Sequence, residues 1–450
     1  MSIPACARRG GLALAAFLLF GTTVTSQGPA PAGASDVMPL VAIVYSFPSE
    51  IISAEDALAL LQAVHRMAPE RRIIVFADGP QIGRLAAPAA DLGVYWIDTG
   101  RRELSPWPRD PVLLRRLGDY GLDIMVRPNQ QANREDDLYF AEMLAAALPH
   151  VLEFPWAQKP LQTVAPSPFH NGQVVRTTAA AWVSVHSVEQ RTLELLDLPR
   201  VPAETFGQRY GVQRYLEAAR QSARELEGVF GRPVKWVHPL PGNNSDPEQA
   251  TLMAAIGGGA GYDLDSLLTL LPEHSGDGPF ALVGDVRAGL DLLKQHSPAE
   301  LGSFASFWGL ELNAQELREL PEKLAVSPRT VGLGAFLDLM ASHMAAQGFK
   351  VERVPLLRLP TGLLKDDLEH GQEDFLVGWN NVVIDSAPKT LRAEGFSSGL
   401  KSGDERARQI FARAHCELAL LPPLRESVRR NGGYRCASVP IRAPGRASRS

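Results

Sequence analysis

Short apolar runs separated by amphipathic segments set the pattern of this 450-residue chain. The runs are rich in Val and Ile and are bounded by Gly, Pro, Asp or Asn, which is typical of strands. They lie at 40–46, 72–78, 94–98, 124–128, 173–177, 281–285, 374–379 and 381–385. Apolar residues at three- and four-residue spacing predict helices at 54–67, 134–148, 214–230, 335–347 and 404–415. This alternation predicts an α/β fold.

The order of these elements indicates weak internal repeats. A strand, a helix and a strand fill 40–76, and a similar unit recurs around 335–384. Residues 286–330 are helical in pattern and charge-rich, and we interpret them as an insertion. No Pro-, Gly- or Ser-rich linker divides the body, so the sequence predicts one domain over 35–445, followed by a disordered tail at 446–450.

The first residues have the pattern of a secretory signal. Arg8 and Arg9 precede the apolar run LALAAFLLF, and small residues follow, so residues 1–34 are predicted to be a signal peptide. The run is shorter than the ~20 residues that span a bilayer, which favours cleavage and a secreted or periplasmic protein without a membrane contact. The formal net charge is −5, and no basic stripe interleaved with aromatic residues favours nucleic-acid binding.

Two late cysteines leave two alternatives open. Cys6 lies in the predicted signal, so Cys416 and Cys436 remain. They could form one disulfide, as is common in secreted chains, or stay free. Clusters of His, Cys and Asp at metal-ligand spacing and glycine-rich phosphate loops are both lacking in the sequence, so neither a metal nor a cofactor is expected.

Several polar motifs follow one another in a suggestive order. Trp-Pro-Arg-Asp stands at 107–110, PFHNGQVVRT begins at 168, and GYDLD ends at 265. GWNNVVIDS begins at 378, and NGGYRCAS begins at 431. Carboxylates bind a planar guanidinium through paired N–H···O bonds, and a thiolate can attack its central carbon. Early aspartates and a late thiol are thus the groups that hydrolysis of a guanidino group needs.

The motif order resembles the pentein superfamily of guanidino-group-modifying enzymes, with agmatine deiminases and bacterial-type peptidylarginine deiminases most similar. The resemblance covers roughly residues 38–445. It implies a five-bladed propeller of ββαβ units. It also implies Cys436 as nucleophile, Asp110 and Asp265 as guanidinium-binding carboxylates, and Trp107, Arg109, Asn171 and Gly433 as substrate-binding residues.

This chain departs from the family pattern at three positions. Asp263-Leu264-Asp265 stands where the family has His-x-Asp, so Asp263 replaces the acid/base histidine. His170-Asn171-Gly172 stands where the family has Glu-Gly-Gly, so His170 replaces a carboxylate. Arg435 replaces the histidine that often precedes the nucleophile. These changes allow an exchange in which His170 becomes the acid/base group and Asp263 joins the carboxylates around the cation.

Two hypotheses follow for the function. The first is a secreted deiminase-like hydrolase of linear amidines, acting on a small-molecule or peptidyl guanidino substrate through Cys436. The alternative is a catalytically impaired pentein-fold protein that binds a ligand or partner in the former active-site pocket. A purely structural interpretation would make Cys436 a buried apolar residue and Asp110 part of a surface ion pair. It leaves the Trp107–Asp110 motif unexplained.

Overall fold

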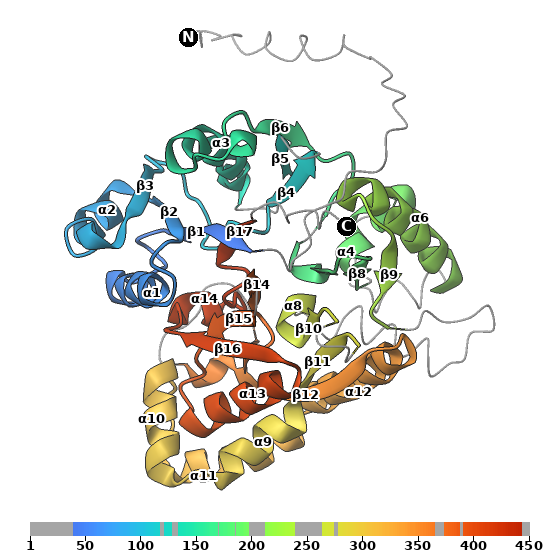
Figure 1. The fold of residues 1–450 in the computed structure, drawn as a ribbon. Coiled ribbons are helices and arrows are strands. Elements are labelled where there is room, and N and C mark those ends of the chain that lie inside the picture. Colours follow the sequence, from blue (N-terminus) through green and yellow to red (C-terminus); the bar gives the residue numbers. More distant parts are fainter. Residues whose placement is uncertain are drawn as a thin grey trace, which may run out of the picture.

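The computed structural model describes residues 39–117, 121–127, 134–169, 171–184, 186–197, 212–238, 263–273, 278–364, 373–387 and 390–442. The predicted signal peptide, the predicted tail and His170 lie outside these residues. The described residues form five small sheets with helices between their strands, so the prediction of an α/β fold is confirmed (Figure 1).

The first sheet joins the two ends of the described chain. Its strand order is β17-β1-β2-β3, with bounds Ser438–Arg442, Leu40–Phe47, Arg72–Ala77 and Val94–Asp98. Strand β1 pairs with β17 in antiparallel fashion and with β2 in parallel. In Figure 1 the last strand, in red, lies beside the first, in blue. The helices between these strands are α1 (Ala54–Met67), α2 (Gly79–Leu85) and the 3-10 helix η1 (Ala90–Leu92).

Helix α1 shows how local sequence sets an element. Ser53 caps its first turn by accepting a hydrogen bond from the Asp56 amide at 3.1 Å. Ala57, Leu60, Leu61 and Val64 repeat every three or four residues and are buried on one face. The observed bounds equal the predicted range of 54–67 because cap and periodicity agree.

Three-stranded sheets follow along the chain. The second sheet contains β4 (Val112–Leu117), β5 (Gly121–Val126) and β6 (Leu161–Val164), with η2 (Glu135–Leu138), α3 (Tyr139–Val151) and η3 (Pro155–Ala157) between β5 and β6. The third contains β7 (Val174–Arg176), β8 (Ala181–Val183) and β9 (Val234–Trp236), with η4 (Asn171–Gln173) before it and α4 (His186–Leu195) and α6 (Val212–Phe230) before β9.

The remaining sheets are built by the C-terminal half. The fourth orders β10 (Leu268–Leu271), β11 (Phe280–Asp285), β12 (Lys350–Pro360) and β13 (Asp374–Gly378). Its helices are α8 (Leu264–Leu267), α9 (Val286–Gln295), α10 (Pro298–Trp308), α11 (Ala314–Ala325), α12 (Pro328–Ala346) and η5 (Thr361–Leu363). The fifth contains β14 (Val383–Ala387), β15 (Thr390–Phe396) and β16 (Cys416–Leu421), with α13 (Lys401–Arg413) between the last two and α14 (Arg425–Arg429) after them.

One connection pattern recurs in four of the five sheets. In the second to fifth sheets, an antiparallel pair of neighbouring strands is followed along the chain by a parallel pair whose connection contains at least one helix. In the first sheet, the antiparallel neighbour of β1 is β17, from the other end of the chain. Parallel neighbours need such a crossover, whereas antiparallel neighbours can be joined by a short turn. The described chain therefore repeats a ββαβ unit, a more regular arrangement than the weak repeats read from the sequence.

Several elements differ from the ranges predicted above. The segment predicted as a helix from residue 134 begins as η2, where Asp136 and Asp137 accept hydrogen bonds from the amides of Glu103 and Ser105 at 2.8 Å each. Strand β12 was not predicted, because charged residues interrupt its apolar positions. The strand predicted from residue 381 begins at Val383, because Asn381 belongs to the preceding loop.

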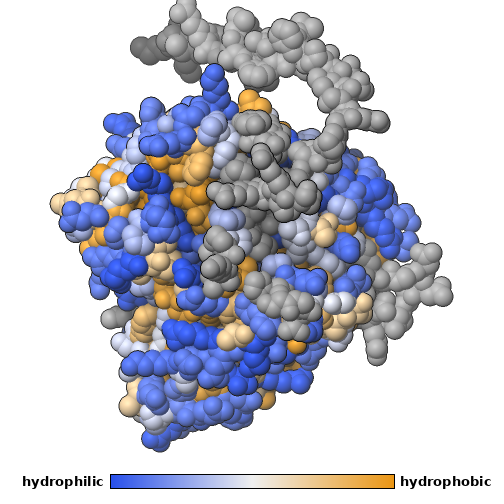
Figure 2. Space-filling view, viewed as in Figure 1, coloured by the Kyte–Doolittle hydropathy of each residue, from blue (hydrophilic) through white to orange (hydrophobic). Residues whose placement is uncertain are grey.

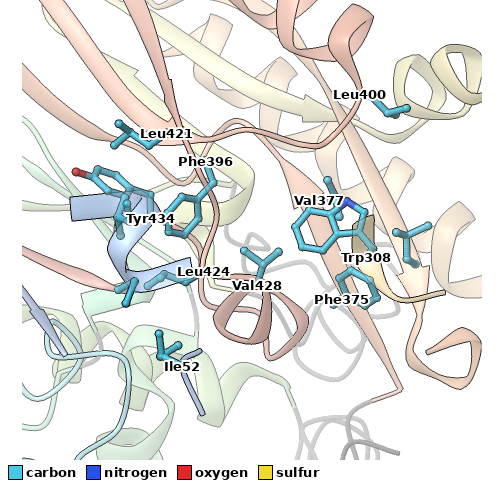
Figure 3. Close-up of a cluster of buried hydrophobic side chains, with 14 of the residues drawn as sticks. Ile52, Trp308, Phe375, Val377, Phe396, Leu400, Leu421, Leu424, Val428 and Tyr434 are labelled. Carbon is cyan, nitrogen blue, oxygen red and sulfur yellow. The ribbon is translucent and has the colours of Figure 1, made fainter. Parts of the chain in front are cut away.

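The described core consists of four hydrophobic clusters, and single clusters contain residues of more than one sheet. Figure 3 shows one cluster in which Trp308 and Phe375 pack near Val428, and Tyr434 packs against Phe396. The Tyr434 and Phe396 rings are edge to face, with centroids 5.3 Å apart. The core thus supports the segment that carries Cys436, two residues after Tyr434.

The surface is mostly hydrophilic in the view of Figure 2, above all over α9, α11 and α13. None of the described helices has by itself the length and apolar character needed to cross a bilayer. The helices Gln315–Ala325 and Pro328–Ala346 meet both requirements only together, as a pair bent by 53°.

Candidate active site

Cys436 lies in the turn between α14 and β17. The Gly432 amide donates to the Ser427 carbonyl at 2.7 Å, and the Ala437 amide donates to the Gly433 carbonyl at 3.0 Å. A β-carbon on Gly432 would lie 1.8 Å from the Trp107 Nε1, and one on Gly433 would lie 2.4 Å from the Asn381 side chain. The double glycine is therefore required because two side chains approach the backbone that leads to Cys436.

Asp263 and Asp265 bring their carboxyl groups to this cysteine. Asp263 precedes the short helix α8 and Asp265 lies in its first turn. The Cys436 Sγ is 4.0 Å from Asp263 Oδ2, and 3.8 and 3.9 Å from the two Asp265 oxygens. Cys436 is 2% exposed and Asp265 is fully buried. Residues about 170 positions apart thus form one buried cluster.

Asn381 contacts several members of this cluster through its side-chain amide. Its Nδ2 donates to Asp265 Oδ1 at 2.8 Å and lies 3.3 Å from the Cys436 Sγ. Its Oδ1 accepts from the Arg435 amide at 2.6 Å. The sequence analysis included the segment GWNNVVIDS among its motifs without assigning a role to Asn381. Its position in that motif was the only local signal.

Asp110 and Trp107 lie on the loop before β4. The Arg134 Nη1 donates to Asp110 Oδ2 at 2.9 Å, and the Arg134 guanidinium lies 5.2 Å from the centre of the Trp107 ring. The Trp107 Nε1 donates to the Ser427 Oγ at 3.1 Å, which joins this loop to the cysteine turn. Asp110 Oδ1 is buried and has no hydrogen-bond partner among the described residues. One carboxylate oxygen at the site therefore remains available to a ligand.

Asn171 and Gln173 follow His170 in the sequence, and His170 itself lies outside the described residues. The Asn171 Nδ2 donates to the carbonyls of Arg109 and Val112 at 2.7 and 2.8 Å, so this amide holds the Arg109 loop. The Gln173 Nε2 donates to Asp263 Oδ1 at 3.0 Å. A β-carbon on Gly172 would lie 2.2 Å from Asp263, so glycine is needed here for the close approach of that carboxyl group.

The structure therefore brings several predicted site residues together. Cys436, Asp263 and Asp265 are in contact, Asp110 is close enough to act on their charges, and Arg435 Nε is 3.6 Å from Asp265 Oδ2. Asn171 and Gly433 support neighbouring loops through backbone contacts. Missed by the sequence analysis were Asn381, Arg134, Gln173 and Ser427.

Burial and like charges control proton affinity at the site. Burial raises the pKa of the Cys436 thiol well above its usual value, and the Asp265, Asp263 and Asp110 carboxylates raise it further. Burial also raises the pKa of Asp265 to about 7, a rise that Asp263 and Asp110 reinforce and that Arg435 and Arg109 oppose. Without a bound cation, Cys436 is therefore a neutral thiol near pH 7.

The same donor atoms bear on metal binding. One ligand atom each from Asp263, Asp265 and Cys436 lies within 4.8 Å of the other two. The Arg435 and Arg109 cations act directly on Asp265 and supply countercharge there. These arginines lower the net negative charge that any cation would meet at this cluster.

Both free cysteines are buried, and no disulfide joins them. Cys416 opens β16 and packs in the hydrophobic core of the fifth sheet, where burial raises the pKa of its thiol to about 12. Cys436 lies instead among carboxylates. The alternative of one Cys416–Cys436 disulfide is therefore not what the structure shows.

Comparisons with known proteins bear on the fold. The sequence matches no protein-family model and no curated protein sequence. An X-ray structure assigned as an agmatine deiminase is similar to this chain at a TM-score of 0.50 and 11% identity, covering 92% of this chain and 95% of that one.

Two further structures are similar over a like extent. One is assigned as an arginine deiminase from Porphyromonas gingivalis, at a TM-score of 0.47, 13% identity and coverage of 91% and 97%. The other is the agmatine deiminase of Enterococcus faecalis, at a TM-score of 0.48, 11% identity and coverage of 92% and 95%. The first of the three structures shows that this chain shares the fold of an agmatine deiminase structure, as the motif resemblance led us to expect.

Proposed function

We propose that this protein is a deiminase-like hydrolase that cleaves a C–N bond of a guanidino group through Cys436. The observation that carries the proposal is the convergence of the Cys436 thiol with the carboxyl groups of Asp263 and Asp265 at 3.8–4.0 Å. A thiol surrounded by carboxylates suits a cationic substrate with several N–H donors.

The fold that we propose for this function is a five-bladed propeller. Four sheets each contain a ββαβ unit in chain order, and in the first sheet the C-terminal strand β17 supplies the antiparallel neighbour of β1. Such closure would place the five sheets around one axis, and segments from four of them meet near Cys436. Asp110 precedes β4, Asp265 precedes β10, Asn381 precedes β14 and Cys436 precedes β17.

Binding of the cation would also activate the nucleophile. Burial, together with the negative charges of Asp265, Asp263 and Asp110, raises the pKa of the Cys436 thiol well above its usual value. A guanidinium held between Asp110 Oδ1 and Asp265 would offset these charges and lower the thiol pKa, because a nearby cation favours the thiolate. The substrate would be a small-molecule or peptidyl guanidino compound.

A specific observation favours the second candidate, a catalytically impaired protein that only binds its ligand. Arg134 already pairs with Asp110 at 2.9 Å, and Arg435 lies 3.6 Å from Asp265. These arginines neutralise part of the charge that would attract a cation. The position of the family's acid/base histidine is also occupied by Asp263. In this alternative a guanidino ligand binds but no ammonia is released.

Ammonia release from arginine, agmatine and arginyl peptides tests the proposal, with ligand binding followed by calorimetry. The wild type should release ammonia, and Cys436→Ala should reduce release to background while binding persists. Asp110→Asn should weaken binding. Cys416→Ser is the matched control, because it changes a buried thiol far from the carboxylates. Binding without ammonia release by the wild type would favour the impaired protein, and neither binding nor release would reject both.

We also propose that residues 1–34 direct export and are removed. The Arg8-Arg9 pair and the apolar run that follows support this. Mass spectrometry of the protein recovered from a secreting host should show a new N-terminus near residue 34, whereas an intact N-terminus would contradict it.

A further inference from the structure

Two carboxyl groups at the site are too close to ionise independently. Asp263 and Asp265 are separated by one residue at the start of α8, and ligand atoms from both lie within 4.8 Å of each other and of the Cys436 Sγ. Like charges at this distance in a buried site oppose each other, so one of the two carboxyls tends to keep a proton.

We propose that the Asp263–Asp265 pair holds one proton between its carboxyl groups and delivers it to the ammonia that leaves the guanidino carbon. The pair would thus act as the acid/base group in place of the histidine whose position Asp263 occupies. This inference rests on the proposed function for its chemical step, although the shared proton itself can be observed without turnover.

Hydrogen bonds from the side-chain amides of Gln173 and Asn381 orient the two carboxyl groups of the pair. The Gln173 Nε2 donates to Asp263 Oδ1 at 3.0 Å, and the Gln173 Oε1 accepts from the Ser184 Oγ at 2.6 Å, which fixes the orientation of the amide. The Asn381 Nδ2 donates to Asp265 Oδ1 at 2.8 Å. Asp263 Oδ2 and Asp265 Oδ2 lie 4.0 and 3.9 Å from the Cys436 Sγ. The proton-carrying atoms thus face the reacting sulfur.

The charges that face the pair come from two other segments. Among the described residues, the loop before β4 contributes Asp110 and Arg109, and the turn before β17 contributes Arg435 and Cys436. Burial, then Asp263, then Asp110 raise the pKa of Asp265, whereas Arg435 and Arg109 lower it, and the result is about 7. A group with this pKa is partly protonated at neutral pH and exchanges its proton readily, as a general acid requires.

The proton balance of the first half-reaction is simple. The Cys436 sulfur forms a bond to the central carbon of the guanidinium, and the thiol proton passes to the carboxylate of the pair. The carboxyl of the pair gives its proton to one amino nitrogen, the C–N bond breaks and ammonia leaves. The enzyme keeps an S-linked amidinium with the single positive charge of the substrate, and the pair again holds one proton.

Water completes the cycle in the second half-reaction. The pair takes a proton from the attacking water as its oxygen bonds to the carbon. The C–S bond then breaks, and the proton of the new hydroxyl returns to the sulfur, which restores the thiol. The product is the neutral ureido compound. The pair then releases the additional proton to solvent, where the ammonia that left earlier takes it up as ammonium, and the pair again holds one proton. No oxidant, metal or further reactant is needed.

Infrared titration tests the shared proton directly. The carbonyl stretch of a protonated carboxyl group is separate from that of a carboxylate, so each can be followed as pH rises. The wild type should show a protonated carboxyl that titrates near pH 7, and Asp265→Asn should remove it. Asp263→Asn should shift it to lower pH, because a like charge is lost. Asp123→Asn, which changes a buried carboxyl in the second sheet, should leave the signal in place.

Turnover separates catalysis from mere protonation. Asp263→Asn and Asp265→Asn should each slow ammonia release by roughly 10²-fold or more, and Asp263→His, which restores the family's motif, should recover release. Lack of any carboxyl that titrates between about pH 6 and 8 would overturn the proposal. Loss of release in His170→Ala with both aspartate variants fully active would also overturn it. A titrating pair in a protein that releases no ammonia would instead reject the hydrolase function and leave the shared proton established.

Discussion

Two buried polar clusters meet at residues 434–436 and are organised in opposite ways. In the first, Arg71 donates to the two carboxylate oxygens of Glu394 at 2.7 and 2.6 Å and to Asp385 at 2.9 Å. Tyr434 donates to Glu394 at 3.2 Å, and its hydroxyl is 2.7 Å from that of Tyr45. Every acid in this cluster has a hydrogen-bonded partner, so the cluster ties the first sheet to the fifth.

The second cluster surrounds Cys436 and leaves its charges less well matched. Asp265 is 3.6 Å from the Arg435 Nε, and Asp110 Oδ1 has no hydrogen-bond partner among the residues described. The pKa values of Cys436 and Asp265 are both raised. The comparison teaches that buried charge alone does not identify a functional site. What distinguishes the second cluster is the raised pKa of the Asp265 carboxyl and an Asp110 oxygen without a partner among the described residues.

The largest effect on stability is expected in the first cluster, in which Arg71 pairs with Glu394 and Asp385. Arg71→Met leaves the Glu394 carboxylate buried without its counterion and should lower the free energy of unfolding by about 3–5 kcal/mol. Denaturant titration measures the loss. The double variant Arg71→Met, Glu394→Met should recover most of it, because the unpaired charge is gone. A loss within about 0.5 kcal/mol for the single variant, the range of an ordinary surface substitution, would show that the two clusters do not differ in this way.

In contrast to the paired acids of the first cluster, the Asp265 carboxyl lowers the free energy of unfolding when it is ionised. Its pKa is raised to about 7 in the folded protein, against ~3.9 in the unfolded chain, so its contribution to stability is fully present below pH ~4. That contribution is lost as pH rises toward and through 7, and it amounts to a few kcal/mol because one pKa unit is about 1.4 kcal/mol.

Asp265→Asn removes this dependence. The variant should therefore lose less stability than the wild type between pH 5 and pH 8, as measured by denaturant titration at each pH. Asp98→Asn, an exposed change at the end of β3, serves as control. Parallel pH dependence in the wild type and Asp265→Asn would contradict the raised pKa.

Cys436 reactivity gives a smaller and more local effect. Asp110→Asn removes one of the charges that raise the thiol pKa, so alkylation by iodoacetamide at pH 8 should be faster than in the wild type. Peptide mass spectrometry measures the rate at Cys436, with Cys416 as the internal reference. Equal rates in the two proteins would show that Asp110 does not act on the thiol. Faster alkylation combined with weaker guanidino binding would show that Asp110 belongs functionally to the second cluster, around Cys436.

The smallest effect concerns the link between the Asp110 loop and the cysteine turn. Trp107→Phe loses the hydrogen bond from Nε1 to the Ser427 Oγ and should cost about 1 kcal/mol of unfolding free energy. Differential denaturant titration against the wild type is sensitive enough to detect this. Because Ser427 also donates to the Gly432 carbonyl at 2.7 Å, Ser427→Ala should cost more than Trp107→Phe. The reverse order would mean that the indole contributes mainly by packing.

Local sequence determined the elements whose signals lie within one segment. Helix α1 agrees with its predicted range because Ser53 and the spacing of Leu60, Leu61 and Val64 act over a few residues. The double glycine before Cys436 and the Asp263–Asp265 spacing were also readable, as motifs. Strand β12 was not, because its apolar positions are shared with charged residues that only neighbouring strands make acceptable.

Tertiary structure alone decided which groups surround the thiol. Asn381 reaches Asp265 across 116 positions, and Arg134 reaches Asp110 across 24. Such pairings follow from the packing of separate sheets, and no local periodicity encodes them. The raised pKa of Asp265 has the same origin, since it arises from burial and from charges that distant segments contribute. The sequence by itself thus determined which reactive groups exist, and only the fold decided the distances that set their proton affinities, because electrostatic energy depends on separation in space and on burial.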